Sequence, residues 1–179
     1  MKTHRKAFTL VEILVVIAVI GILALWASRL NFSRISQLEL LNIESIKMLS
    51  SIEEARNNAL VGRVVSAWWE APESWRIVFD VVNDSYTTEY VQTSGTPESV
   101  ASSKLRSPFE ISAIVCKWID KTALWNIANS GNITFYTNGQ TTIDWCSHSD
   151  ARLVDIEIWF WSKRKTIRVN TITNVIEEI

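Results

Sequence analysis

The residues best suited to chemistry in this 179-residue chain gather in one short segment, residues 144–150. This segment contains Asp144, Cys146, His148 and Asp150, whose side chains can bind a metal ion. A zinc site needs about four ligands and a calcium site about six or more oxygens, and the sequence has no second cluster that would complete either set. We therefore expect a solvated turn here, with no metal and no cofactor.

The sequence also lacks the short motifs of common enzyme classes. It contains no Gly-x-Ser-x-Gly nucleophile motif, no phosphate-binding loop and no His-Glu-x-x-His zinc motif. The formal net charge is -1, so no strongly basic face for nucleic acid is implied. We predict neither an enzyme nor a nucleic-acid partner, and the function should lie in assembly.

A single charge interrupts the apolar N-terminal segment. From Phe8 to Ala27 there are 20 residues, and Glu12 is the one charged residue among them. As a helix this segment would be about 30 Å long, which matches the hydrocarbon core of a bilayer and predicts a transmembrane helix. A charge in lipid costs roughly 2.5 to 3.5 kcal/mol, which makes Glu12 a candidate functional residue.

The residues around Glu12 form a motif. Phe8-Thr9-Leu10-Val11-Glu12, behind a short basic leader at residues 1–7, resembles the class III leader of type IV pilins and pseudopilins. The resemblance implies that a prepilin peptidase cleaves between Ala7 and Phe8 and that the new Phe8 amine is methylated. It also implies that Glu12 pairs with the N-terminus of a neighbouring subunit. The family usually has Gly before the cut, and Ala7 is a small substitute.

Two other interpretations of this segment are open. A Sec signal peptide needs a small-x-small cleavage site, which residues 25–28 do not offer. A plain membrane anchor would leave Glu12 reaching towards the headgroups, which explains part of the cost of its charge. In either case Lys2, Arg5 and Lys6 keep the N-terminus cytoplasmic and place the remainder of the chain outside the cytoplasmic (inner) membrane.

The two cysteines lie in this extracytoplasmic part of the chain. Because that compartment is oxidising, Cys116 and Cys146 are a candidate disulfide. Two buried free thiols are the alternative.

The apolar pattern becomes amphipathic beyond the membrane segment. Apolar residues recur every three or four positions as far as about Val61, with no proline and with Gly21 as the one glycine of the stretch. The sequence predicts one helix of roughly 50 residues, with 8–27 as its transmembrane and assembly part and 28–62 as its amphipathic continuation. The alternative is two helices broken near residues 31–33.

The periodicity changes to that of β-strands in the C-terminal part, which predicts an antiparallel β-sheet head domain over residues 75–179. Residues 93–108, rich in Ser, Thr, Gly and Pro, are predicted to form a long polar loop. The fold class is therefore α+β, a long N-terminal helix packed on a C-terminal antiparallel sheet domain, as the pilin resemblance also implies. The predicted strands are Arg76–Val82, Tyr86–Gln92, Phe109–Cys116, Asn132–Thr137, Leu153–Phe160, Lys165–Thr171 and Asn174–Glu177, and the predicted turns are residues 83–84, 130–131, 138–139 and 162–163.

A second resemblance concerns the subtype. Glu54-Ala55-Arg56-Asn57-Asn58-Ala59 at the end of the helix and Arg76-Ile77-Val78-Phe79-Asp80 at the start of the sheet resemble the minor pseudopilin type called H, or the related minor pilins. The resemblance implies the same order of elements over most of the chain.

The tryptophan content is unusual. The chain has nine Trp and five Gly, whereas an average chain of this length has roughly a dozen Gly. Trp161, ahead of Ser162 and Lys163, is one of several Trp at places where Gly is natural. Translation of UGA as tryptophan, in a gene from a lineage that reads it as glycine, would produce this pattern. The alternative is a truly Trp-rich domain, in which Trp159 and Trp161 would contact a partner and would lie on one face of a strand if the strand runs on through both.

The sequence thus predicts a structural subunit of a type IV pilus-like filament or a type II secretion pseudopilus. Its expected partners are a prepilin peptidase, an inner-membrane assembly platform, other pilin or pseudopilin subunits and membrane lipid. It would be held in the inner membrane by a single pass and then moved into an extracytoplasmic filament or to the cell surface. The alternative is a membrane-anchored extracytoplasmic binding module that never enters a filament.

Overall fold

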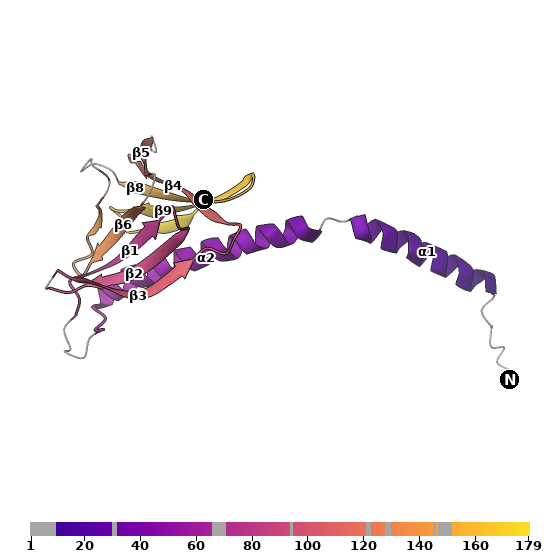
Figure 1. The fold of residues 1–179 in the computed structure, drawn as a ribbon, viewed down its shortest axis with the longest axis horizontal. Coiled ribbons are helices and arrows are strands. Elements are labelled where there is room, and N and C mark those ends of the chain that lie inside the picture. Colours follow the sequence, from indigo (N-terminus) through magenta and orange to yellow (C-terminus); the bar gives the residue numbers. More distant parts are fainter. Residues whose placement is uncertain are drawn as a thin grey trace. The chain divides into compact units, whose positions relative to one another are not determined.

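The computed structural model describes residues 10–29, 32–65, 71–93, 95–120, 123–127, 130–144, 146 and 152–179 (Figure 1). The chain divides into two units, Met1–Gln37 and Leu38–Ile179, and each is treated by itself. Two helices come first in the sequence, α1 (Leu10–Arg29) and α2 (Phe32–Val61). Ten strands follow: β1 (Ser74–Asp80), β2 (Ser85–Val91), β3 (Pro97–Lys104), β4 (Glu110–Lys117), β5 (Ala123–Ile127), β6 (Ser130–Tyr136), β7 (Thr141–Ile143), β8 (Leu153–Phe160), β9 (Lys163–Asn170) and β10 (Ile176–Glu178).

The described part of the helical region contains two helices, α1 and α2, and residues 30 and 31 between them lie outside the described residues. The prediction of one continuous helix and the alternative of a break near residues 31–33 therefore both stay predictions. Among the residues that the structure describes, no helix is long and apolar enough to count as a membrane span.

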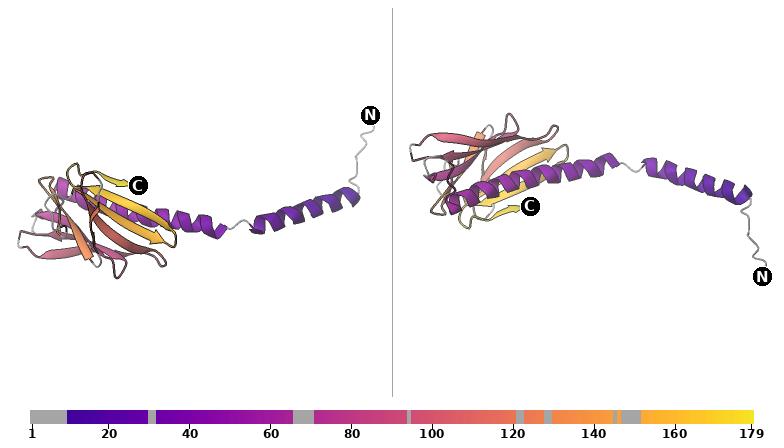
Figure 2. Two further views of the ribbon diagram at one scale, coloured as in Figure 1. Left: turned by 90° about the horizontal axis from the view of Figure 1, so that it is seen from above. Right: turned by 90° about the horizontal axis from the view of Figure 1, so that it is seen from below.

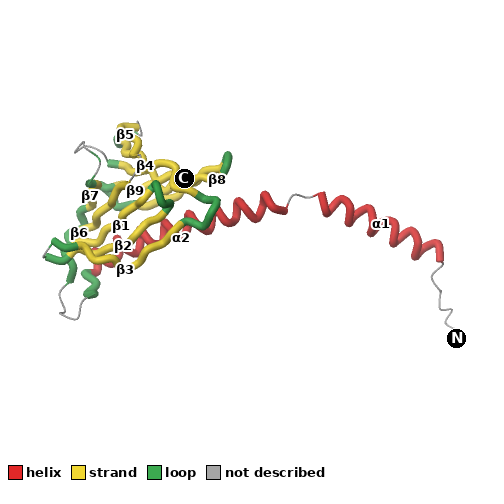
Figure 3. Tube along the Cα trace, viewed as in Figure 1, coloured by secondary structure: helices red, strands yellow, loops and turns green. Residues whose placement is uncertain are grey.

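The second unit contains two five-stranded antiparallel sheets, whereas the sequence predicted a single sheet. Their strand orders are β3-β2-β1-β6-β7 and β10-β9-β8-β4-β5 (Figure 3). Burial alternates along β1, where Trp75, Ile77 and Phe79 face the core, and this alternation made the central strands predictable. The strands predicted from sequence correspond to β1, β2, β4, β6, β8, β9 and β10.

One core joins the two sheets to the helix. The described part of α2 that belongs to the second unit contributes a stripe of buried residues, Leu41, Met48, Ile52, Ala55 and Ala59, to the same cluster as both sheets. Figure 2 shows α2 lying against the strands in both views. Because these residues recur at helical spacing, the amphipathic pattern of the sequence correctly identified the packed face of α2.

The segment predicted to be a polar loop, residues 93–108, contains β3. All eight residues of β3 are exposed, so the strand has no apolar alternation that a sequence pattern could reveal. β3 forms through backbone pairing with β2 at the edge of the sheet, supported by a hydrogen bond from the Thr87 hydroxyl to the Ser102 hydroxyl at 3.2 Å. The predicted turn at residues 130–131 is also wrong, because both residues belong to β6.

Candidate functional site

The side chains described in α1, from Leu10 to Leu25, are exposed on every side of the helix. The large apolar ones range from 49% exposed at Val19 to 77% at Leu10. A helix that is apolar all round belongs in an apolar surrounding, and an exposed apolar surface of this extent marks an interaction site. The surface of α1 is therefore the first candidate for function.

Glu12 is exposed and lies in the first turn of α1. The N-terminal end of a helix carries a partial positive charge, which favours a carboxylate in this turn. The two other residues predicted for processing, Ala7 and Phe8, lie outside the described residues. The predicted roles of all three therefore stay predictions.

The head carries a disulfide between Cys116 and Cys146, the pair expected from their compartment. Cys116 is fully buried on β4, and Cys146 follows β7, with 6.3 Å between the two Cα atoms. The bond connects the segment after β7 to a strand of the other sheet, and so it restrains the connection between the two sheets.

The predicted turn at residues 144–150 is only partly described. Asp144 and Cys146 lie within the described residues, and residues 145 and 147–151 lie outside them. Elsewhere in the described ranges, no group of three or more His, Cys, Asp and Glu side chains is arranged to hold a metal ion.

A buried ion cluster centred on Asp155 lies in the second sheet. Asp155 on β8 is 1% exposed and accepts two hydrogen bonds of 2.7 Å from Arg168 on β9 and one of 2.7 Å from Lys117 on β4. Burial would raise the pKa of the Asp155 carboxyl, but the hydrogen bonds and positive charges of Arg168 and Lys117 outweigh burial and lower it. The hydrogen bond to Asp155 is the main reason that the pKa of Arg168 is raised.

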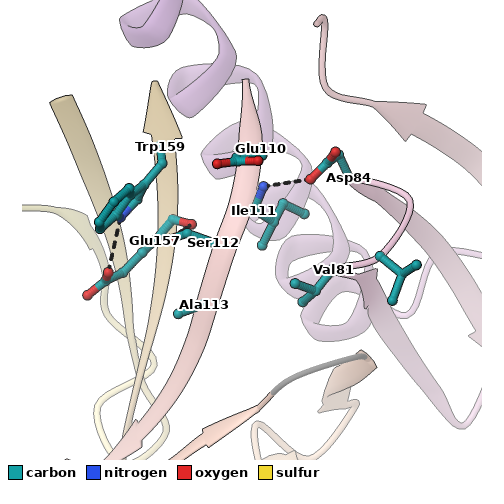
Figure 4. Close-up of a pocket in the computed structure, with 9 residues that line it drawn as sticks. Val81, Asp84, Glu110, Ile111, Ser112, Ala113, Glu157 and Trp159 are labelled. Atoms are coloured by element: carbon teal, nitrogen blue, oxygen red, sulfur yellow. Dashed lines mark hydrogen bonds between the residues drawn. The ribbon is translucent and has the colours of Figure 1, made fainter. Parts of the chain in front are cut away.

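A cavity of about 580 Å³ opens beside this sheet, lined by Val81, Val82, Asp84, Glu110, Ile111, Ser112, Ala113, Glu157 and Trp159 (Figure 4). Asp84 accepts a hydrogen bond of 3.0 Å from the Ile111 backbone N–H. Glu157 accepts one of 3.4 Å from the Trp159 indole N–H. Two of the three lining carboxylates, Asp84 and Glu157, thus have hydrogen-bond partners within the fold.

The N-terminal motif is matched by a family model. Residues 2–28 match the model described as the prokaryotic N-terminal methylation motif. The chain therefore carries the prepilin-type signal of type IV pilins and pseudopilins, which is a substrate signal for prepilin peptidase. No curated protein and no solved structure matches the chain.

Sequence reasoning found the motif but missed the ion cluster of the head. Glu12 was visible because it is the one charge in an apolar segment. Asp155 offers the same kind of signal, because it interrupts the apolar run of Leu153, Val154 and Ile156 in a predicted strand. A charge at a buried strand position needs a partner of opposite charge, and this rule would have directed attention to the basic residues of the next strand.

Proposed function

We propose that the chain is a structural subunit of a type IV pilus-like filament or a type II secretion pseudopilus. The observation that carries the proposal is the methylation motif at residues 2–28, with Glu12 in the first turn of a helix whose other residues from Leu10 to Leu25 are uncharged and exposed. Such a helix needs an apolar surrounding, and a bundle of similar apolar helices in a filament of like or different subunits provides one.

The precursor would be stored in the inner membrane before assembly. Residues 1–7 are the leader in this proposal, and residues 8–27 are held in lipid by their apolar side chains. Lys2, Arg5 and Lys6 keep the leader on the cytoplasmic side, where prepilin peptidase cleaves between Ala7 and Phe8. An inner-membrane assembly platform then moves the mature subunit from lipid into the filament.

Glu12 has a defined task in this assembly. Its carboxylate would neutralise the methylated Phe8 amine of a neighbouring subunit when both groups become buried among apolar helices. Pairing offsets the cost of burying each charge alone, and it sets the register between subunits. Because one residue in the first turn carries the charge, a shift of the helix along its neighbour would lose this pair.

The amphipathic continuation, residues 28–62, and the head, residues 75–179, would form the outer part of the subunit. The H-type minor pseudopilin is our proposal for the subtype. It is supported by the position of its two matching segments, since residues 54–59 lie near the end of α2 and residues 76–80 lie in β1.

Processing gives the decisive test. Mass spectrometry of the mature protein from its native envelope should find an N-terminal, N-methylated Phe8. A variant with a bulky residue before the cut, Ala7→Leu, should remain as precursor, and Ala7→Gly, the matched control, should be cleaved at least as well as the native chain. A mature start at Met1, or a start near residues 27–30, would refute the pilin proposal and favour an anchored binding module or a Sec substrate.

A further inference from the structure

The hairpin between β8 and β9 has an unusual residue in its turn. The two strands are paired up to Phe160 and Lys163, which leaves a two-residue loop of Trp161 and Ser162. Trp161 has a φ of 57°, in the left-handed region. The strand therefore ends before Trp161, so the condition for Trp159 and Trp161 to share one strand face, a strand that runs through both, is not met.

A positive φ in a two-residue hairpin loop favours particular residue types. The commonest two-residue hairpin loops are of type I′, with a positive φ at both residues, or type II′, with a positive φ at the first residue alone. Among the described residues Trp161 has a positive φ and Ser162 does not, which corresponds to type II′. The first residue of a type II′ turn is typically Gly, and Gly-Ser is a common pair for such a loop.

The other positive-φ residues of the described chain follow this rule. They are Gly62, Gly95 and Gly139, together with Asp84 and Asn174. Gly has no Cβ to clash in this region, and Asp and Asn are the non-glycine types that enter it most readily. Trp161 is the one bulky side chain in the set, and it stands where the backbone favours glycine.

The Trp161 side chain makes few contacts that could offset the free-energy cost of its positive φ. It is 84% exposed, and its ring contact is with the adjacent Phe160, at 6.2 Å between centroids. An exposed indole leaves most of its apolar surface in water, so burial does not compensate the strained backbone. Tryptophan is thus unfavourable here for both its backbone and its side chain.

We propose that residue 161 is glycine in the native protein, because its codon is UGA and the source cell reads UGA as glycine. The same reassignment accounts for the composition of the chain, nine Trp beside five Gly, and extends to most of the other Trp positions. Trp75 is the exception, since it is 1% exposed and packs in the core, where glycine would leave a void. This proposal is independent of the filament function.

Peptide sequencing tests the proposal directly. Trypsin should release residues 153–163 of the native protein as one peptide, since Arg152 and Lys163 flank it. Mass spectrometry should find Gly at position 161, and the gene should carry UGA at codon 161. Trp at position 161 in the native peptide, or a UGG codon, would overturn the proposal and leave the exposed indole as a candidate partner contact.

A pair of variants tests the structural reason separately. In the full chain expressed with Trp at all nine positions and held in detergent, Trp161→Gly should raise the thermal unfolding midpoint by several degrees. Trp161→Ala is the matched control, because it removes the indole but keeps a Cβ in the left-handed region. A midpoint for the Ala variant equal to or above that of the Gly variant would contradict the argument that the backbone requires glycine.

Discussion

Arg168 on β9 lies directly opposite Asp155 on β8, and its guanidinium donates a hydrogen bond of 2.7 Å to each carboxylate oxygen of Asp155. Lys117 on β4 lies 2.7 Å from the same carboxylate, so one buried charge links three neighbouring strands. Burying the Asp155 carboxylate away from water costs free energy, and its pairing with Arg168 and Lys117 offsets that cost. This cluster fixes the register of the second sheet, because a shift of one residue would move Asp155 to the opposite face.

Removal of the charge from Asp155 should destabilise the head strongly. Asp155→Asn keeps the shape of the side chain but leaves Arg168, 8% exposed, buried without a full counter-charge. We expect a loss of about 3–5 kcal/mol in the free energy of unfolding, measured by urea denaturation at pH 7. Glu54→Gln is the control, since Glu54 on α2 forms an exposed ion pair at 3.5 Å with Arg63, which follows the helix, and the substitution should change stability by less than about 1 kcal/mol. Equal effects of the two substitutions would contradict the assigned role of Asp155.

The stability of the head should depend on pH through the same residue. Because the pKa of Asp155 is lowered in the folded state, the folded carboxylate holds its charge at pH values where the unfolded residue, with a pKa of about 3.9, takes up a proton. Its contribution is fully present above about pH 5 and is lost as the pH falls through the folded pKa. Unfolding free energies from pH 7 to pH 3 should fall less steeply for Asp155→Asn than for the native chain. Parallel curves would exclude Asp155 as a source of this dependence.

Reduction of the disulfide should loosen the connection between the sheets. Cys116 and Cys146 are separated by 30 positions in sequence, and closing a loop of this size removes chain entropy from the unfolded state worth roughly 3 to 4 kcal/mol. The double variant Cys116→Ser/Cys146→Ser should lower the free energy of unfolding by about this amount. Alkylation of denatured, unreduced protein from its native envelope should label neither thiol. Labelling of both would refute the bond.

Glu12 should be needed for assembly and dispensable for processing. Glu12→Ala removes the carboxylate that we propose to pair with the amine of a neighbouring subunit, while it leaves the cleavage site intact. The variant should be cleaved before Phe8 and remain in the membrane fraction, but it should be absent from sheared filaments. Glu39→Ala, which removes an exposed carboxylate from α2, is the control and should assemble normally. Normal incorporation of the Glu12 variant would sink the proposed pairing.

Most of the elements in which buried apolar residues recur at a regular spacing were predicted from the sequence. The strand β8 was predicted with its observed bounds, because its residues have strand-type periodicity and the turn signal Ser162-Lys163 follows it. β3 was missed, since all of its residues are exposed and its strand character comes from pairing with β2. Pairing between distant segments leaves no local pattern to detect, and the same limit explains why the division into two sheets was not predicted.

The N-terminal site was predictable because it is a contiguous motif. The residues from Phe8 to Glu12 carry their chemical signal within five consecutive positions, without help from the remainder of the fold. The ion cluster of Asp155 needed the register of three strands, which the sequence does not specify.

Trp75 should be a genuine tryptophan, in contrast to residue 161. It is 1% exposed, its ring lies 5.9 Å from that of Tyr90 on the neighbouring strand, and glycine in its place would leave a cavity in the core. Trp75→Gly should therefore lower the free energy of unfolding by more than about 3 kcal/mol.

Trp75→Phe should cost less, because it keeps an aromatic ring and removes an indole N–H that has no hydrogen-bond partner among the described residues. Urea denaturation of both variants gives the comparison, and native peptides should contain Trp at position 75. Native Gly there, or a Gly variant as stable as the Phe variant, would show that the core does not need this side chain.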